Sequence, residues 1–397
     1  MRILLLVVYY LPSTMSSAKL IHDLALEFRK RGHEPAVVAP DDSIPEDTEL
    51  TWEEGIQVLR VRTGKIKTAS RLTRGLNEAM LSRTIWEKGR RFFENRSFDL
   101  IVYYSPTIFF GSLVARLKAR FACPSYLVLR DIFPQWAVDA GVLRRGLAYA
   151  YFKFKERQNY EAADIIGVQS PANLRHFETR RLDRKYRLEV LYNWTALEED
   201  IRPGGNRQRL GLDGKVIFFY GGNIGVAQDV DNIVRLAGAL RNESSAYFLL
   251  VGSGSEVPRL REVIASNGLT NIAIHDAVGQ REYLALLAEC DVGLISLDRG
   301  LRTQNFPGKM LGYMYHSMPM LASVNPGNDL KTLLEDHEAG LVCINGDDEV
   351  LAAHARRLAA DRELRQRLGK NARSLLENTF SVTRAADRIL AHFEKRN

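Results

Sequence analysis

Residues 302–325, RTQNFPGKMLGYMYHSMPMLASVN, combine a cationic turn, a short helical pattern and an apolar strand in direct succession. Arg302 and Lys309 flank the turn, and the run that follows Pro319 is typical of a buried strand. A helix that begins after a Pro-Gly turn leaves its first backbone N–H groups free and carries a partial positive charge there. The segment therefore predicts an α/β domain with a pocket for a phosphate or diphosphate. An ordinary loop and helix is the alternative interpretation of this segment alone.

Apolar runs of strand length alternate with amphipathic helical stretches along the rest of the chain. This alternation is typical of parallel sheets that are covered by helices. The first series of predicted strands comprises Ile3–Tyr9, Pro35–Ala39, Ile56–Val61, Leu100–Tyr104, Tyr126–Leu129, Ile165–Val168 and Leu188–Leu191. The second series comprises Val216–Tyr220, Tyr247–Val251, Ile272–Ile274, Val292–Ile295, Met320–Ala322 and Leu341–Ile344.

A Pro/Gly-rich segment between the two series marks a domain boundary. We predict an α/β protein with two Rossmann-like domains, at residues 1–200 and 213–380, which are joined by a linker at 201–212 and face each other across a cleft. We expect a C-terminal helix within 381–397, and a return of this helix to the first domain is one option. In such sheets ligands bind beyond the carboxyl ends of the strands.

The composition is that of a globular protein, since 46% of the 397 residues are hydrophobic and 26% are charged. No apolar run reaches the roughly 20 residues that a membrane-spanning helix needs, and the apolar start lacks a signal-peptide cleavage pattern. The three cysteines are far apart and form neither a metal-binding spacing nor a disulfide framework. We therefore expect reduced thiols and a cytoplasmic location.

Positive charge is concentrated in the first half of the chain. Residues 60–157 contain 20 basic and 7 acidic residues, a net charge of +13, whereas residues 206–397 contain 23 of each. Aromatic side chains share helical faces within the basic segment, such as Trp86 with Phe93 and Tyr151 with Phe154. We predict an anionic membrane surface as the partner of this face; core aromatics with solvated cations are the alternative. No nucleic-acid-binding motif is present, so nucleic acid is not expected.

Two glycine turns end successive strands of the second series. Gly222, Asn223 and Gly225 belong to the first turn, and Gly252 and Gly254 belong to the second. Glycines let backbone N–H groups approach an anion closely. The pattern is not the G-x-G-x-x-G of a nicotinamide dinucleotide site. Together with Arg302 and Lys309 the turns favour a nucleotide diphosphate, although each turn alone could be a plain strand–helix connection.

These segments together resemble the retaining nucleotide-sugar glycosyltransferases of the large group 1 (family 4) class, which have the two-domain GT-B fold. The resemblance covers nearly the whole chain and rests on the order of its motifs. They are the opening strand, Ser16–Ala18, Lys30–Glu34, Tyr160–Asp164, Tyr192–Thr195, Gly221–Gly225, Val251–Gly254, Ala288–Val292 and Phe306–Lys309. Leu129–Pro134 and the Asn193-Trp194 pair look like the bacterial O-antigen and capsule branch, which includes N-acetyl-fucosaminyl transferases.

The resemblance implies transfer of a sugar from a nucleotide donor, with fixed cations stabilising the leaving diphosphate. Lys309 and Arg302 are expected in this role, and Asp131 is expected to orient or deprotonate the acceptor hydroxyl. The donor-binding residues expected are Gly222, Asn223, Gly225, Gly252, Gly254, Val278, Gln304, Asn305, Phe306, Gly308 and Lys309. The acceptor-binding residues expected are Tyr10, Ser16, Ser17, Arg130 and Asp131. Helix capping, a solvent loop and an Arg130–Asp131 pair are the alternatives for this second set.

No metal and no cofactor are expected beyond the nucleotide sugar itself. Asp229 and Asp231 resemble a paired-carboxylate metal motif, but carboxylates at the start of a helix favour capping. The chain also departs from the family pattern. Two glutamates of the donor side are replaced by Gln304 and Gly312, so the expected ribose contact is missing.

The full prediction is a retaining transferase that moves a sugar from a UDP-type donor, with an N-acetylated amino sugar preferred, to a polyprenyl-diphosphate-linked acceptor. It would act in bacterial surface-polysaccharide assembly, at the inner face of the cytoplasmic membrane. Two alternatives stay open. A sugar-nucleotide 2-epimerase would bind the same donor without needing a basic face, and the departures at Gln304 and Gly312 allow a catalytically silent binding subunit.

Overall fold

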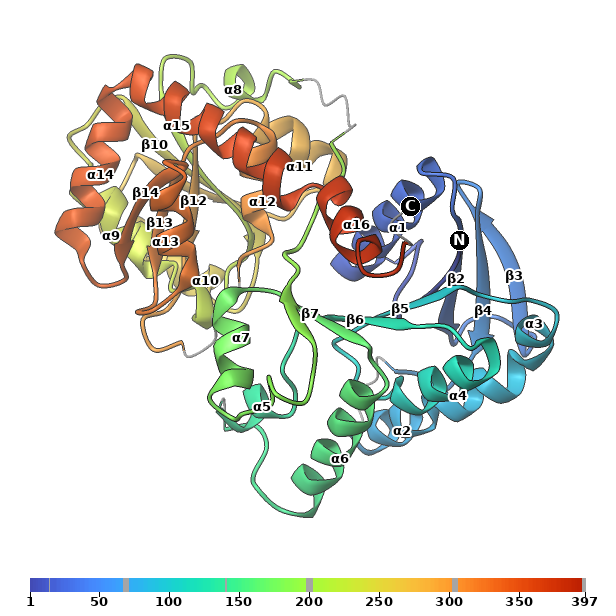
Figure 1. Cartoon of the computed structure of the whole chain (residues 1–397). Helices are drawn as coiled ribbons and strands as arrows, with labels where there is room; N and C mark the ends of the chain where they lie inside the picture. Colours follow the sequence, from blue (N-terminus) through green and yellow to red (C-terminus); the bar gives the residue numbers. More distant parts are fainter. Residues whose placement is uncertain (14, 67–70, 140, 198–202, 302–305, 395–397) are drawn as a thin grey trace. The chain divides into compact units, whose positions relative to one another are not determined.

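The computed structural model describes residues 1–13, 15–66, 71–139, 141–197, 203–301 and 306–394 (Figure 1). The chain forms two compact units. Unit 1 comprises Met1–Thr195 and Val382–Asn397, and unit 2 comprises Ala196–Ser381. Each unit contains one sheet with helices on both faces, so the predicted α/β fold with two Rossmann-like domains is confirmed.

The sheet of unit 1 has eight strands in the order β3-β4-β2-β1-β5-β6-β7-β8. Every neighbouring pair is parallel except β3 with β4. The strands are β1 Arg2–Leu6, β2 Glu34–Asp41, β3 Thr48–Glu53, β4 Ile56–Arg62, β5 Leu100–Tyr104, β6 Ser125–Leu129, β7 Ile165–Val168 and β8 Leu188–Val190. The central strands read as continuous apolar runs because both of their faces are buried.

The helices of unit 1 divide between the two faces of this sheet. They are α1 Ser16–Lys30, α2 Arg71–Lys88, α3 Arg90–Glu94, α4 Gly111–Phe121, α5 Gln135–Asp139, α6 Leu147–Glu161, α7 Pro171–Glu178 and α16 Val382–Leu390. Helices α1 and α16 cover one face, while α2, α4 and α6 cover the other (Figure 1).

The C-terminal helix α16 packs on α1 within unit 1. Arg31 of α1 donates hydrogen bonds to the carboxylate of Asp387, at 2.7 Å, and to the carbonyl of Thr383, at 2.9 Å. The backbone N–H of Val382 donates to the carbonyl of Thr195 at 3.0 Å. The last residue of the first segment of unit 1 therefore lies beside the first residue of its second segment.

Unit 2 has a six-stranded parallel sheet in the order β11-β10-β9-β12-β13-β14. Its strands are β9 Val216–Asn223, β10 Ala246–Ser253, β11 Ile272–His275, β12 Val292–Ser296, β13 Met320–Val324 and β14 Gly340–Ile344. The strand order reverses between β9 and β12. This is the Rossmann order, which places ligand sites beyond the carboxyl ends of those two strands.

The helices of unit 2 are α8 Asn206–Arg209, α9 Asp231–Ala239, α10 Val257–Ser266, α11 Gln280–Leu287, α12 Lys309–Tyr315, α13 Asp329–Asp336, α14 Asp348–Ala360 and α15 Arg362–Leu375, with a 3₁₀ turn at Val226–Gln228 and a π-helical turn at Leu376–Phe380. Helices α9, α10 and α14 lie on one face of the sheet, and α11 and α12 lie on the other (Figure 1).

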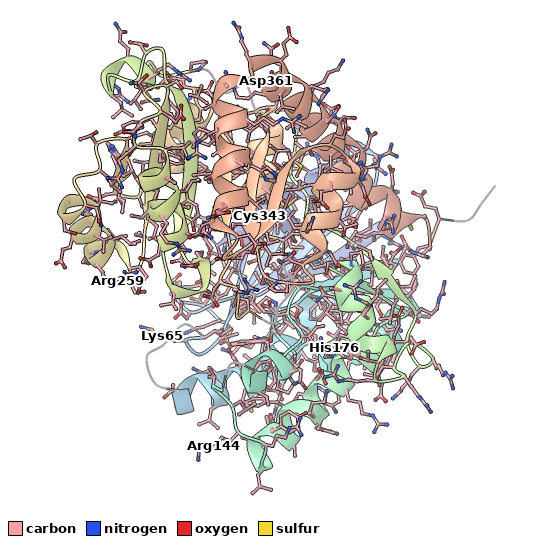
Figure 2. All side chains as sticks on the ribbon, turned by 90° about the vertical axis from the view of Figure 1, so that its left-hand side faces the viewer. Lys65, Arg144, His176, Arg259, Cys343 and Asp361 are labelled. Atoms are coloured by element: carbon pink, nitrogen blue, oxygen red, sulfur yellow. The ribbon has the colours of Figure 1, made fainter. Side chains whose placement is uncertain are left out.

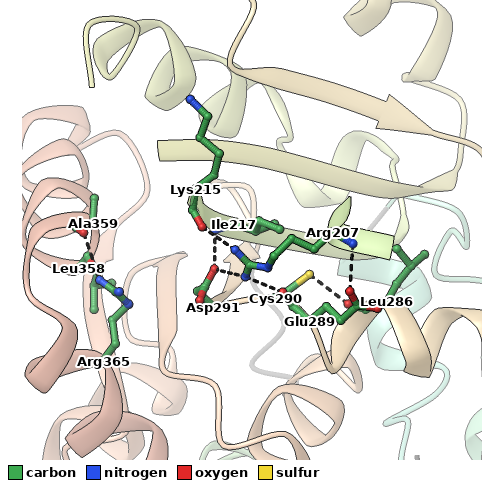
Figure 3. A network of polar contacts seen from close by, with 10 residues as sticks. All are labelled: Arg207, Lys215, Ile217, Leu286, Glu289, Cys290, Asp291, Leu358, Ala359 and Arg365. Atoms are coloured by element: carbon green, nitrogen blue, oxygen red, sulfur yellow. Dashed lines mark hydrogen bonds and ion pairs between the residues drawn. The ribbon is translucent and has the colours of Figure 1, made fainter. Parts of the chain in front are cut away.

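Arg207 of α8 anchors the start of this sheet (Figure 3). Its guanidinium donates to the carboxylate of Asp291 and to the carbonyl of Glu289, both at 2.7 Å, and to the carbonyl of Lys215 at 2.6 Å. Asp291 also accepts the backbone N–H of Ile217 at 2.8 Å. The network joins the entry to unit 2 to the first residues of β9 and β12.

The basic segment of unit 1 divides into a buried and an exposed part. Trp86 stacks on Phe93 with 6.1 Å between ring centres, and Phe92 and Phe93 are both buried. The core interpretation is therefore right for these aromatics. Tyr151 and Phe154 are exposed, as is Leu147 on the same helix.

Within the described part of the chain, no helix combines the length and the apolar character that crossing a membrane requires.

Candidate active site

A cavity of about 330 Å³ opens in unit 2 beyond the carboxyl ends of β9 and β12. Its volume falls in the range typical of small-molecule sites. The described residues that line it are Asn223, Ala227, Gln228, Ile295, Ser296, Leu297, Leu301, Phe306, Pro307, Gly308 and Lys309. None of these carries a carboxylate, and Lys309 is their only cation. The lining therefore suits an anion.

Lys309 is the first residue of α12 and is half-buried. Its ammonium nitrogen lies 3.3 Å from the centre of the Tyr220 ring, a cation–π contact. Burial lowers the pKa of Lys309 from 10.5 to about 7, because the charged form loses its hydration. A diphosphate at this position would favour the charged form again, so the position is chemically suited to an anion.

The predicted first glycine turn is the last part of β9 together with the residues after it, and Gln228 bridges the two. The Gln228 side-chain oxygen accepts from the amide of Asn223 at 2.7 Å and from the backbone N–H of Gly225 at 3.2 Å. Gly222 has a φ of +112°, which side-chain-bearing residues rarely adopt. Both Asn223 and Gln228 line the cavity, and Gln228 was not among the residues expected from the sequence.

The glycines of the second turn pack against the first turn. A Cβ atom on Gly252 would lie 1.8 Å from the carbonyl oxygen of Gly222, and one on Gly254 would lie 2.1 Å from that of Ile224. Neither glycine is among the described residues that line the cavity. The structure therefore shows a packing role for both glycines, and their predicted contact with the donor stays a prediction.

The other predicted donor residues fall into three groups. Phe306 and Gly308 line the cavity. Val278 lies in the connection between β11 and α11 and not in the cavity lining. Arg302, Gln304 and Asn305 lie outside the described residues. A Cβ at Gly312 would meet Leu287 of α11 at 3.0 Å, so that position packs against a helix.

Asn345 ties together the loops that follow β9, β12 and β14. Its amide nitrogen donates to the carboxylate of Asp229 at 2.9 Å and to the carbonyl of Leu297 at 2.8 Å. Its amide oxygen accepts from Asn232 at 2.9 Å. This network supports the rim of the cavity, and sequence reasoning missed it because the partners lie up to 116 residues apart.

Asp229 and Asp231 do not share a site. Asp231 forms an ion pair with Arg259, whose hydrogen bond lowers the pKa of that carboxyl. The residue before α9 is Val230, and neither aspartate caps the helix, so the capping prediction is wrong. Among the side chains that the structure describes, no group of three or more His, Cys, Asp or Glu residues could hold a metal ion.

In unit 1, Asp131 follows the carboxyl end of β6 and is half-buried. Burial raises the pKa of its carboxyl, and the charge of Arg130 opposes that rise. A carboxylate with a raised pKa at a strand end suits a group that accepts or holds a proton. This chemistry is compatible with the predicted role toward an acceptor hydroxyl.

Arg130 is buried, and its guanidinium contacts the segment that follows β8. Its guanidinium donates to the carbonyls of Leu191, at 2.5 Å, and Tyr192, at 3.3 Å, and lies over the Trp194 ring. Burial lowers its pKa. The structure therefore corrects the expected acceptor contact: Arg130 fixes the segment after β8.

The loop after β1 borders a second cavity, of about 210 Å³. Tyr10 lines it but is buried, and its hydroxyl shares a 2.8 Å hydrogen bond with His22. Arg60, which sequence reasoning did not consider, also lines it and donates to the carbonyl of Leu11 at 2.6 Å. Ser16 is exposed at the start of α1, and Ser17 is buried behind it. A motif search misses Arg60 because it sits inside a strand.

Comparison with known proteins places both units in one class. Residues 17–194 match the family described as "Glycosyl transferase 4-like domain", and residues 205–375 match "Glycosyl transferases group 1". The chain is 26% identical over 235 residues to "Probable glycosyltransferase WbjE" of Pseudomonas aeruginosa, covering 57% of each chain. It is 26% identical over 272 residues to "Putative colanic acid biosynthesis glycosyl transferase WcaI" of Escherichia coli (strain K12), covering 65% of each.

Each alignment thus spans less than two thirds of the relative's own length. Among solved structures, Anabaena Alr3699/HepE in complex with UDP superposes with a TM-score of 0.64 and 17% identity, over 99% of both chains. That similarity concerns the fold. The two family matches cover most of the chain in their expected order, and the chain therefore belongs to the group 1 (family 4) glycosyltransferases and has their GT-B fold.

Proposed function

We propose that this protein is a glycosyltransferase that uses a nucleotide-diphosphate sugar as its donor. The observation that carries the proposal is the half-buried Lys309, which lies over Tyr220 and lines a cavity whose described residues include no carboxylate. A UDP-type donor is supported by the UDP complex of the structurally similar HepE. The proposal that the donor carries an N-acetylated amino sugar rests only on the resemblance of this chain's sequence motifs to those of the O-antigen and capsule branch.

The proposed reaction is retaining and needs no metal. Negative charge develops on the diphosphate as it leaves, and a preorganised cation in a half-buried site stabilises that charge strongly. Lys309 supplies this cation, and Arg302 is the second cation expected from the sequence. The described residues of the cavity lining include none of the carboxylates that would hold Mg²⁺ or Mn²⁺. Asp131 is proposed to orient or deprotonate the acceptor hydroxyl.

The proposed acceptor is a sugar on a polyprenyl diphosphate, and the proposed pathway is the assembly of a bacterial surface polysaccharide. The name of WcaI, which refers to colanic acid biosynthesis, supports this class of product. The Leu129–Pro134 and Asn193-Trp194 motifs support the same branch of the family. A cytoplasmic protein that associates with the inner face of the membrane would meet such an acceptor.

The test is incubation of the full chain with a panel of UDP- and GDP-sugars, with and without extracted lipid-linked acceptor. Transfer releases free nucleotide and extends the acceptor, and NMR of the product then reports whether the anomeric configuration is retained. A new nucleotide sugar without nucleotide release would instead indicate an epimerase. Binding without either product would indicate a silent subunit.

The matched variants are Lys309→Met and Lys370→Met. Lys309→Met keeps the aliphatic side chain over Tyr220 but removes the charge, and should lower kcat by about a hundredfold or more. Lys370 lies exposed on α15, and its replacement should leave turnover unchanged. Equal turnover of both variants would remove Lys309 from the mechanism.

A further inference from the structure

Unit 1 carries a cluster of exposed apolar side chains on α5, on the loop after it and on the first half of α6. We call this the α5–α6 surface, and its apolar members are Trp136, Val142, Leu147, Tyr151 and Phe154. Leu147 is 92% exposed and Phe154 is 54% exposed, although they lie one above the other on the same helical face. Large apolar side chains gathered in this way mark an interaction site.

Cations without an ion pair to a described residue lie in the same segment of the chain as these apolar side chains. Arg144 and Arg145 lie in the loop before α6, and neither forms an ion pair with any described residue. Figure 2 labels Arg144, which is exposed on the surface of unit 1. Lys155 lies 5.8 Å from the ring centre of Tyr151 and 5.6 Å from that of Phe154. Charge and apolar contact area thus occupy the same surface.

The cations on α2 and α3 differ in this respect. Arg83 pairs with Glu87 at 2.7 Å, and Arg90 pairs with Glu94 at 2.6 Å. The aromatics beside them are buried in the core. The second part of the basic segment therefore combines unpaired arginines with exposed aromatic side chains, whereas the exposed apolar residues of α2, Leu76 and Met80, are not aromatic.

The α5–α6 surface is continuous with the end of β6. The ring of Phe133, two residues after Asp131, lies 6.0 Å from Trp136 and 5.0 Å from Phe152 of α6, centre to centre. Phe152 in turn contacts Tyr151. An unbroken row of aromatic rings thus joins the segment of the candidate carboxylate to the exposed surface.

We propose that the α5–α6 surface docks on an anionic lipid bilayer, so that a lipid-linked acceptor is presented at the end of β6 beside Asp131. Arginine and lysine attract anionic headgroups, while Trp, Leu and Phe side chains insert at the boundary with the acyl chains. A second copy of the chain fits less well, because a symmetric contact would bring the same cations face to face. The delivery of an acceptor rests on the proposed function, whereas the docking does not.

Co-sedimentation of the full chain with vesicles tests the docking. The wild type should bind vesicles of phosphatidylcholine with phosphatidylglycerol, release them as salt rises, and bind phosphatidylcholine alone weakly. Each cation near an anionic surface contributes about fivefold in partitioning, so Arg144→Gln, Arg145→Gln and Lys155→Gln together should lower binding by about a hundredfold. The matched triple Arg362→Gln, Arg367→Gln and Lys370→Gln, on exposed positions of α15, should bind as the wild type does.

Tryptophan fluorescence identifies which side chain enters the lipid. Brominated lipids should quench the wild type, should lose that quenching with Trp136→Phe, and should keep it with Trp52→Phe. Trp52 is a stringent control because it is more exposed than Trp136, at 63% against 41%, but lies on the edge strand β3. Quenching that disappears with Trp52→Phe instead would place the lipid contact elsewhere and overturn the proposal.

Three further results would also overturn it. They are no binding of the wild type at low salt, equal loss of binding in the two triple variants, and a wild-type dimer that Leu147→Ser with Phe154→Ser converts to a monomer without affecting vesicle binding. Both serine positions are exposed, so the folded state should persist, which circular dichroism checks. A protein that docks as described but transfers no sugar would refute the proposed function and leave the docking intact.

Discussion

Binding of the donor should depend on pH through Lys309. Because the pKa of this lysine is about 7 in the empty site, roughly half of the molecules carry a neutral side chain near pH 7. A diphosphate beside the ammonium favours the charged form and raises the pKa again. Donor binding should therefore take up a proton, and the affinity should fall as the pH rises through the pKa of the empty site.

The magnitude follows from that pKa. Only the protonated fraction of the empty site binds the diphosphate well, and this fraction falls about tenfold between about pH 6 and pH 8. The donor Kd should rise by the same factor. A nucleotide sugar is the right probe, because its diphosphate is a diester with no proton to lose in this range. Isothermal titration calorimetry in buffers of different ionisation enthalpy then counts the protons taken up directly.

Lys309→Arg is the matched control for this measurement. Arginine keeps its charge throughout the range, so the Kd of the variant should be nearly independent of pH and its binding should take up no proton. A wild-type Kd that is constant from pH 6 to pH 8, or a binding reaction without proton uptake, would refute the assignment of Lys309 to the diphosphate. An equal pH dependence in wild type and Lys309→Arg would assign the titration to another group.

Three other changes have defined outcomes. Gly252→Ala should lower Tm and the yield of folded protein, because its Cβ would overlap the carbonyl oxygen of Gly222; Gly308→Ala, which has open space around it, should keep the Tm of the wild type. Arg130→Met should destabilise unit 1 by about 2 kcal/mol, because it leaves buried backbone carbonyls without their donor, and urea unfolding measures this; an unchanged stability with a raised acceptor KM would restore Arg130 as an acceptor contact. Activity should persist in EDTA, and a strict requirement for Mn²⁺ would contradict the metal-independent mechanism.

The central parallel strands could be predicted because both of their faces are buried and each reads as one apolar run. Strand β3 was missed for the opposite reason. Its glutamates at 49 and 53 alternate with Leu50 and Trp52, which are exposed at the sheet edge. A sequence of that kind resembles a surface loop, and only pairing with β4 makes it a strand.

Helical spacing alone did not show which aromatic side chains are buried, and Trp86 and Phe93 lie on two helices, α2 and α3. Trp86 with Phe93 and Leu147 with Phe154 have the same spacing of seven, yet the first pair packs together with Phe93 in the core and the second is exposed. Whether such a pair is buried depends on whether a neighbouring element packs against it, and that packing is set by residues far away in the chain.

For the candidate site, too, local patterns could be predicted from the sequence but long-range contacts could not. Lys309 stands out locally because it follows a Pro-Gly turn, but its contact with Tyr220 joins residues 89 positions apart. Arg130 was expected to contact the acceptor, whereas it donates to two backbone carbonyls that lie about 60 positions further on. Long-range partners of this kind leave no local pattern in the sequence.

Unit 2 is an insertion within unit 1, since the two segments of unit 1 flank it in the sequence. The hydrogen bond between Val382 and Thr195 joins the two junctions. The chain leaves unit 1 and re-enters it at adjacent points, so the two ends of the inserted segment start from neighbouring positions. Domains whose ends meet in this way tolerate excision, exchange and circular permutation. A short linker from Thr195 to Val382 would therefore close unit 1 on itself. Unit 2 of a relative could equally be grafted between the same two residues, and the hybrid would show whether nucleotide-sugar preference moves with that unit.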